Sequence, residues 1–304
     1  MAELVQAAVK AAGALGIAEY AETLAEDGYV IVPPEVTGVT PKVIERLTEL
    51  ILAHSEKLVG CPWSVEDGPA QDITFGGFPG TLELMHAEAQ APVEPAQFQL
   101  MQLCKEDRAF RDLAVNRVAA ALINTVIGLG AARFSSHNCF VKWKGDGYGE
   151  KLGLHVDQGL PSPLCLNANC NWALTDYMLE DGPLAVIPGS HLRDVNFYQE
   201  IGKEGVLDVA VAEAVPVVCP KGSLIVFHGK LWHGAFPRQN DGLRLTLAYF
   251  WRHVSIVPQD DIPNDFPVEL AEDCVDPKAF KKHAGFGSTG YHNQVLPVPK
   301  VANL

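Results

Sequence analysis

The 304-residue sequence predicts a mainly β protein, a sandwich or jelly roll with helices packed outside it. From about residue 133 onward, short apolar stretches of strand type are separated by turn sequences such as KGDG, EDG, PGS and NDG. Before about residue 128, apolar residues mostly recur at the three- and four-residue spacing of helices. The order of these two patterns indicates a helical N-terminal layer followed by a β core.

The N-terminal part contains two well-marked helical segments. Residues 40–58 begin with Thr40 as the expected N-cap and Pro41 at the first helical position. Residues 105–128 keep the same apolar spacing and end near a glycine. Residues 27–34 predict one short strand stopped by prolines.

The C-terminal part supplies the other strands. They are expected within residues 133–144, 151–157, 170–179, 183–188, 214–228, 231–236 and 243–254. The sequence has no internal repeat, low-complexity segment or linker. We therefore expect one domain over residues 1–304, with a mainly helical layer at 1–128, a jelly-roll core at 130–255 and a C-terminal extension at 256–304.

Composition narrows the class of partner. The net charge of -14 argues against a nucleic-acid surface or an anionic membrane, which both require clustered Lys and Arg, so we expect a small-molecule substrate. The N-terminus lacks a basic segment followed by an apolar core, and no apolar run approaches the ~18 residues of a membrane span. Seven scattered cysteines without a C-x-x-C argue against a disulfide framework. These features indicate a soluble protein of the cytoplasm.

The stretch GLHVDQ places two ionisable residues in an apolar run. In a strand, His155 and Asp157 would project from the same face, so they could bind one metal ion. The alternative is a half-exposed strand with two polar residues facing solvent. A third ligand could come from far downstream, because a jelly roll brings distant strands to one barrel mouth. The candidates are His191, His228, His233 and His253, and a turn role is expected for His191, which follows the turn residues PGS. His228 and His233 both lie in GSLIVFHGKLWHGAF, and periodicity does not separate them.

Arg244 opens the apolar strand RLTLAYFW. Burying an unpaired guanidinium is costly, so a carboxylate partner is expected. Its planar fork of donors suits bidentate binding of a carboxylate. A salt bridge to one of the protein's own acidic residues and exposure at the strand start are the alternatives.

Four pieces of the sequence resemble, in this order, the phytanoyl-CoA dioxygenase family of Fe(II)- and 2-oxoglutarate-dependent oxygenases. They are HVD at 155–157, CNWALTDYMLEDGPLAVIPGSH at 170–191, GSLIVFHGKLWHGA at 222–235, and Arg244. The segment LAEDGYVIV at 24–32 resembles the family's N-terminal strand entry. The resemblance covers roughly residues 130–255 and implies a double-stranded β-helix, the cupin-like form of the jelly roll.

The resemblance also implies which residues act. In the family an Arg follows the distal His by eleven residues, and Arg244 stands eleven residues after His233. The implied Fe(II) ligands and catalytic residues are therefore His155, Asp157 and His233, a facial triad that leaves open positions on the metal. Arg244 is the implied partner of the distal carboxylate of 2-oxoglutarate.

Two further co-substrate residues follow from the same resemblance. Trp172 matches the family's Trp on the strand after H-x-D, where it lines the 2-oxoglutarate pocket; a core aromatic is the alternative. On the strand at 133–144, Asn138, Phe140, Lys142 and Lys144 share a face that the family uses for co-substrate contacts. Lys142 is the expected contact and Lys144 its rival.

The implied reaction uses O2, converts 2-oxoglutarate to succinate and CO2, and hydroxylates a small to medium, partly apolar organic substrate. Residues 72–100 and the loop after Asp157 are the expected pocket walls, with Phe78, Met85, Phe98 and Leu164 as apolar candidates. Two alternatives are a metal-dependent jelly-roll isomerase or lyase that does not use 2-oxoglutarate, and a non-catalytic binding protein on the same fold. The spacing of Arg244 disfavours the former.

Overall fold

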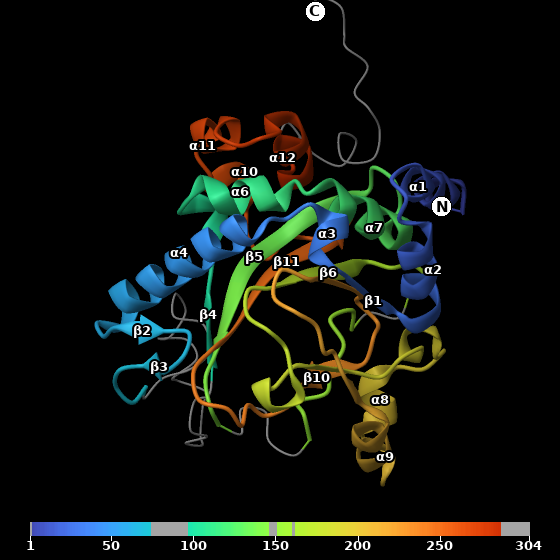
Figure 1. Cartoon of the computed structure of the whole chain (residues 1–304). Coiled ribbons are helices and arrows are strands. Elements are labelled where there is room, and N and C mark those ends of the chain that lie inside the picture. Colours follow the sequence, from blue (N-terminus) through green and yellow to red (C-terminus); the bar gives the residue numbers. More distant parts are fainter. Residues whose placement is uncertain (1, 74–96, 146–150, 160–161, 287–304) are drawn as a thin grey trace, which may run out of the picture.

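A computed structural model describes residues 2–73, 97–145, 151–159 and 162–286. Its main element is a six-stranded antiparallel sheet, here called the major sheet (Figure 1). In spatial order its strands are β1 (Tyr29–Val32), β9 (Leu224–His228), β6 (Asn167–Ala173), β11 (Arg244–His253), β5 (Ala132–Lys142) and β4 (Gln97–Leu100). The strands β6, β11 and β5 are distant in sequence but adjacent in space, so their side chains share one surface.

A smaller sheet, the minor sheet, consists of β10 (His233–Ala235), β7 (Leu184–Val186) and β8 (Val215–Pro216). An isolated antiparallel bridge between His155 and His233 adds the H-x-D segment to its edge. The strand expected at 151–157 is therefore shorter than predicted and reduces to this bridge. Residues of both sheets line one cavity, which places it between the two sheets.

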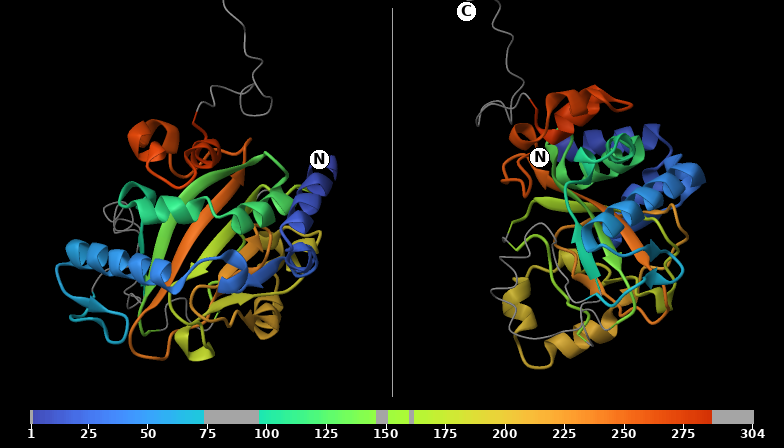
Figure 2. Two further views of the ribbon diagram at one scale, coloured as in Figure 1. Left: turned by 45° about the horizontal axis from the view of Figure 1, so that its top comes forward. Right: turned by 90° about the vertical axis from the view of Figure 1, so that its left-hand side faces the viewer.

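Helices cover the opposite face of the major sheet (Figures 1 and 2). The helices that contribute to one apolar core with that sheet include α1 (Ala2–Ala14), α2 (Ala18–Asp27), α4 (Pro41–Val59), α6 (Arg108–Ala114) and α7 (Arg117–Ile127). The remaining helical elements are α3 (Pro34–Thr37), η2 (Leu103–Lys105), η3 (Leu179–Asp181), η4 (Ser190–Leu192), α8 (Phe197–Ile201), α9 (Val206–Glu213), α10 (Ile262–Asp265), α11 (Val268–Glu272) and α12 (Pro277–Ala284). A short hairpin joins β2 (Trp63–Ser64) to β3 (Gly68–Pro69).

The description "mainly β" was wrong in one respect, because the described helices hold more residues than the strands. The sheet's outer face is apolar and must be covered, and the helical layer supplies that cover. Among the residues that the structure describes, no helix has the length and apolar character needed to cross a membrane.

One of the two helix predictions is confirmed, and the other is corrected. The segment at 40–58 is confirmed as α4, with Pro41 at its first position and Thr40 at the N-cap, although the Thr40 side chain makes no capping hydrogen bond. The segment at 105–128 is two helices rather than one. The Asn116 side chain accepts hydrogen bonds from the backbone N–H groups of Val118 and Ala119, which starts α7 afresh.

Side chains of β6 alternate between the core and the cavity. Trp172 is fully buried in the apolar core shared with the helices, as are its neighbours two and four positions back along the strand. Asn169 and Asn171 point the other way and line the cavity. The prediction that Trp172 lines the co-substrate pocket was therefore wrong, and its alternative as a core aromatic is correct. A strand residue cannot serve both faces.

The position of Trp172 leads to a stability prediction. Trp172→Ala removes a large side chain from a packed core, so we expect a loss of about 3–5 kcal/mol in the free energy of unfolding. Denaturant unfolding monitored by circular dichroism measures this loss. A change below about 1 kcal/mol, the size usual for surface sites, would contradict this placement.

Candidate active site

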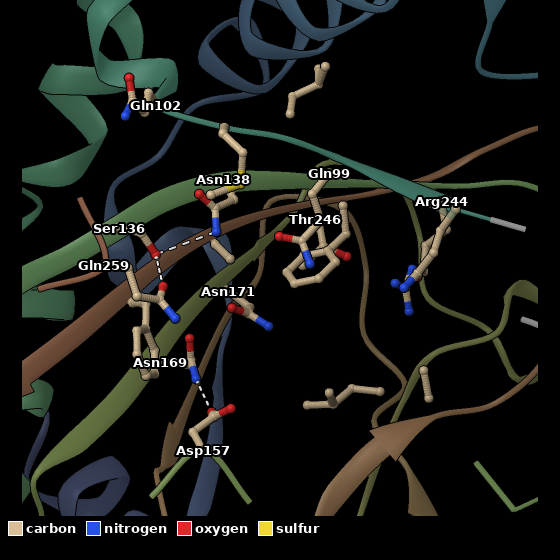
Figure 3. A pocket seen from close by; sticks show the side chains of 18 of the residues that line it. Gln99, Gln102, Ser136, Asn138, Asp157, Asn169, Asn171, Arg244, Thr246 and Gln259 are labelled. Carbon is tan, nitrogen blue, oxygen red and sulfur yellow. Dashed lines mark hydrogen bonds between the residues drawn. The ribbon is translucent and has the colours of Figure 1, made fainter. Parts of the chain in front are cut away.

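The cavity between the sheets has a volume of about 1010 Å³. Pockets for small molecules commonly measure about 300–1,000 Å³, so this cavity lies at the upper end of that range. Its walls come mainly from β4, β5, β6, β9 and β11 of the major sheet, from β7 and β10 of the minor sheet, and from the H-x-D segment, with further residues from α4 and η2. Figure 3 shows labelled side chains of β4, β5, β6 and β11, together with Asp157, around the open space.

Three predicted ligands meet in this cavity. His155, Asp157 and His233 each offer one ligand atom, and the three atoms lie within 4.8 Å of one another. The Nε2 atom of His155 is 3.8 Å from Oδ1 of Asp157, and Nε2 of His233 is 3.7 Å from Oδ2 of the same carboxylate. Antiparallel backbone pairing of the two histidines sets their proximity. The H-x-D strand phase and the downstream histidine thus converge as predicted.

Backbone carbonyls orient both imidazole rings. Nδ1 of His155 lies 2.8 Å from the carbonyl oxygen of Gly153, and Nδ1 of His233 lies 2.9 Å from that of Leu231. Each Nδ1 can therefore donate its hydrogen, which leaves the Nε2 lone pair directed at the carboxylate. Burial lowers the pKa of His233, against the opposing effect of Asp157, and this favours the neutral, metal-binding form. The donor set fits a divalent transition metal such as Fe(II).

Asn169 positions the carboxylate, a role that sequence reasoning did not assign. Its Nδ2 donates a hydrogen bond of 2.6 Å to Oδ2 of Asp157 (Figure 3). The side chain of Asn167 additionally donates to the backbone carbonyl of Asp157. The signal available in the sequence was the alternation Asn167, Asn169, Asn171 on a buried strand, which places three amides on one face.

The other candidate histidines lie elsewhere. His228 ends β9, and its Nδ1 accepts the backbone N–H of Lys230. It stacks near His191, with ring centroids 5.2 Å apart, and burial lowers its pKa to about 3. His253 ends β11 and contacts Ser255. Neither residue lines the cavity, so among the downstream histidines that the structure describes, His233 is the one that joins His155 and Asp157 there.

Arg244 enters the cavity at one end of β11. One terminal nitrogen donates a 2.6 Å hydrogen bond to the carbonyl of Gly182, and the guanidinium lies 5.2 Å from the ring centroid of Tyr177. Its Nε has no partner, and no carboxylate within the described residues forms an ion pair with it. The predicted carboxylate partner is thus not one of the described acidic side chains, and the guanidinium retains donors for a ligand.

Lys142 and Lys144 are clearly distinguished. Lys144 is exposed and pairs with Asp241. Lys142 is fully buried, directly opposite Arg244 in the strand register, and its Nζ donates to the carbonyl of Phe236 at 2.5 Å. Burial, with the charges of Arg244 and a second arginine, lowers the pKa of Lys142 to about 6. Because Lys142 is not among the residues that line the cavity, it lies behind Arg244 rather than at the cavity surface.

The apolar walls expected from sequence are largely elsewhere. Phe98 is fully buried and packs edge-on against Trp63, away from the cavity surface, so that prediction was wrong. Leu164 does not line the cavity either. Phe78 and Met85 lie outside the described residues. Strand periodicity identifies which residues share a face, but it does not reveal which face meets a cavity.

A jelly-roll sandwich with two histidines and one carboxylate at its mouth defines the class of non-haem metal oxygenases. The family model "Phytanoyl-CoA dioxygenase (PhyH)" matches residues 24–246, and the chain belongs to this family, whose members use Fe(II) and 2-oxoglutarate. The match begins at residue 24, where the segment LAEDGYVIV resembles the family's N-terminal strand entry and contains β1, and it ends within β11.

Curated relatives agree with this family. The chain is 29% identical over 164 residues to "Dioxygenase af480" of Aspergillus fumigatus. The aligned region covers 51% of this chain and 49% of that protein. It is 28% identical over 145 residues to "Ectoine dioxygenase" of Stutzerimonas stutzeri, covering 42% and 44% respectively. The chain spans about half the length of the curated relatives it matches.

Solved structures share the fold. The carbocyclase SnoK from nogalamycin biosynthesis, described as non-heme and alpha ketoglutarate dependent, superposes with a TM-score of 0.53 at 20% identity, covering 78% of this chain and 83% of SnoK. HygX from Streptomyces hygroscopicus, solved with nickel and 2-oxoglutarate bound, gives a TM-score of 0.54 at 15% identity, covering 79% and 88%. These likenesses establish the jelly-roll fold of the chain.

The choice between the two histidines of one segment can be tested directly. His233→Ala removes a nitrogen from the cluster, so we expect the purified variant to retain little of the iron bound by the wild-type protein. His228→Ala is the matched control, because it deletes a nearby, partly buried histidine that does not line the cavity. Metal content measured by mass spectrometry decides the question. Wild-type iron in His233→Ala, or its loss in His228→Ala, would show that the distal ligand is misassigned.

The contact from Asn169 yields a separate prediction. Asn169→Ala leaves the three ligand atoms in place but frees the carboxylate to rotate, and loss of such a supporting hydrogen bond typically weakens metal affinity about 10–100-fold. Competition with a metal-binding dye measures the affinity. Asn264→Ala, an exposed amide of α10, is the control and should bind metal as the wild type does. Equal affinity in both variants would refute the positioning role of Asn169.

Proposed function

We propose that the chain is an Fe(II)- and 2-oxoglutarate-dependent dioxygenase that hydroxylates a small to medium, partly apolar organic molecule. The observation that carries this proposal is the presence of a His-Asp-His cluster and a buried arginine with free donors in one cavity. A metal-dependent isomerase or lyase would need the cluster but not the arginine. A non-catalytic binding protein would not need the metal-binding cluster and the buried arginine together in one cavity.

His155, Asp157 and His233 would hold the metal, with Asn169 fixing the carboxylate. Two imidazoles and one carboxylate leave positions for the keto acid and for O2. The bound iron would supply the oxidation of a substrate C–H bond, coupled to conversion of 2-oxoglutarate into succinate and CO2. Because Asp157 occupies the position that a halide would need, hydroxylation is the proposed outcome rather than halogenation.

Arg244 would bind the distal carboxylate of 2-oxoglutarate through its guanidinium fork. Two hydroxyl groups lie beside it, since Tyr177 and Thr246 line the cavity and contact each other through their oxygens. Ala235 also lines the cavity and offers no hydroxyl group. Tyr177 and Thr246 would therefore supply the hydroxyl groups near the co-substrate.

The backbone around the cluster supports the same reading. Gly234 lies between His233 and Ala235, and a Cβ added there would stand 2.1 Å from the carbonyl oxygen of Leu152. Only glycine allows the two segments that carry the histidines to approach this closely. Since both segments belong to one cavity with the major sheet, we further propose that residues 1–304 form a single oxygenase domain.

The proposed reaction is tested by incubating the iron-loaded protein with 2-oxoglutarate, 18O2 and a panel of candidate substrates. Substrate-stimulated release of succinate, with one 18O atom gained by the product, is the expected result. Asp157→Ala is the control and should release no succinate. Turnover of a panel member without 2-oxoglutarate, or a chlorinated product, would overturn the proposal.

Arg244 gives a quantitative test of the co-substrate site. Arg244→Ala should cost about 1.5–3 kcal/mol of 2-oxoglutarate binding free energy, the usual contribution of a hydrogen bond to a charged group. Arg244→Lys should recover only part of it, because a point charge does not reproduce the fork. Anaerobic calorimetry of the metal-loaded protein measures the affinity.

Lys144→Ala, which removes an exposed cation near the same end of the sheet, controls for a general loss of positive charge. It should bind 2-oxoglutarate with wild-type affinity. An Arg244→Ala protein whose affinity matches that of Lys144→Ala would exclude Arg244 as the carboxylate partner.

A further inference from the structure

Two amide side chains on the major sheet face the cavity without protein partners for their oxygens. Asn138 of β5 and Asn171 of β6 both line the cavity, and each has 7% of its surface exposed. No described protein group hydrogen-bonds to Oδ1 of either residue. An unsatisfied buried acceptor costs about 1–3 kcal/mol, so a pair of them in one cavity points to a ligand that supplies donors.

The two amides form one surface with Ala248 of β11. In the strand register Asn138 and Asn171 lie directly opposite Ala248 on its two sides. Neighbouring strands are about 4.8 Å apart, so the two Cα atoms stand roughly 10 Å from each other across a small methyl group. This surface, here called the amide subsite, has room above Ala248 for a ring-sized group held at both edges.

Hydrogen bonding extends the amide subsite along β5. Nδ2 of Asn138 contacts Oγ of Ser136 at 3.4 Å, and Ser136 donates a 2.6 Å hydrogen bond to Oε1 of Gln259 (Figure 3). These groups carry no charge. They therefore suit neutral hydroxyl groups, which both donate and accept, better than they suit a carboxylate or phosphate, which at neutral pH mainly accepts.

The amide subsite is separate from the proposed co-substrate site. Arg244 lies four residues before Ala248, about 13 Å along an extended strand. Its guanidinium turns toward Gly182, which precedes the minor-sheet strand β7, whereas the amides belong to the major sheet. The carbon chain of 2-oxoglutarate spans only about 5 Å, given C–C bonds of about 1.5 Å. A co-substrate between Arg244 and the histidines would therefore follow the minor-sheet wall.

We propose that Asn138 and Asn171 are specificity residues that bind neutral hydroxyl groups of the primary substrate. This inference rests on the proposed oxygenase function and names the substrate class: a neutral molecule with at least two hydroxyl groups on the face that meets β5 and β6. Apolar cavity residues such as Phe140, Phe227 and Phe250 would pack against the rest of the molecule. The ionisable side chains His54, Lys105, Glu106 and Asp260 lie on other elements of the cavity wall and include both acidic and basic groups.

The test uses two related probes, one with hydrogen-bond donors and one in which every donor is methylated. Phenyl β-D-glucopyranoside carries an apolar ring and four hydroxyl groups, and its tetra-O-methyl ether keeps the oxygens but loses every donor. Zn(II), which has no redox chemistry, and 2-oxoglutarate fill the proposed metal and co-substrate sites. Saturation-transfer NMR then reports binding without turnover. We expect the glucoside to bind and its methyl ether not to bind.

Variants assign that binding to the amide subsite. Asn138→Leu and Asn171→Leu keep the side-chain size and should each weaken glucoside binding about threefold to tenfold, as expected for one hydrogen bond. Asn171→Ser, which keeps a polar group at this position and replaces the leucine variant if that variant fails to fold, should show a smaller loss. Asn264→Leu is the control and should bind as the wild type does.

The two proposals fail in distinguishable ways. If calorimetry shows that the wild-type protein does not bind 2-oxoglutarate, the proposed oxygenase function is overturned, and this inference with it. Wild-type 2-oxoglutarate affinity in both leucine variants, together with weakened glucoside binding, supports the amide subsite. Weakened 2-oxoglutarate binding in either leucine variant would assign the amides to the co-substrate instead. Three results would overturn this inference alone. They are an absence of glucoside binding up to its solubility limit, equally strong binding of its methyl ether, and leucine variants that bind the glucoside as the wild type does.

Discussion

The site depends on one pair of backbone hydrogen bonds. The N–H of His155 donates to the carbonyl of His233 at 2.8 Å, and the N–H of His233 donates back to His155 at 3.0 Å. Side chains of such directly opposed residues lie on the same face at close range, so two imidazoles from distant parts of the chain meet. Asp157, two residues after His155, joins them. Gly234 makes the pairing sterically feasible, because any side chain there would meet the backbone of Leu152.

Side chains along the strands of the major sheet alternate between the apolar core, which stabilises the fold, and the cavity, which holds the candidate active site. On β6, Cys170 and Trp172 pack into the apolar core under the helices, while Asn169 and Asn171 face the cavity. The same division holds on β11, where Leu247 is in the core and Ala248 lines the cavity. The helical layer thus stabilises the outer face, and the inner face is free to carry polar groups. Substitutions on the inner face can change binding without removing apolar core contacts.

Positive charge is concentrated at one end of the sandwich. Arg244, Lys142 and Arg238 are all buried there, and burial, together with the charges of the two arginines, lowers the pKa of Lys142 to about 6. Arg238 is paired with Asp181, whereas Arg244 has no described carboxylate partner. Burying such charge is costly unless it is compensated. A dicarboxylate bound at Arg244 would supply that compensation, which gives the arrangement a physical reason under the proposed function.

Local patterns in the sequence are enough to predict that His155 and Asp157 share a face, where α4 begins and ends, and that eleven residues separate His233 from Arg244. Which strand faces meet the cavity depends instead on long-range packing. Trp172 was assigned to the wrong face, and the positioning role of Asn169 was missed, because a period of two identifies neighbours on a face but not what covers that face. That cover comes from helices and a second sheet brought together by long-range packing, which no local pattern encodes.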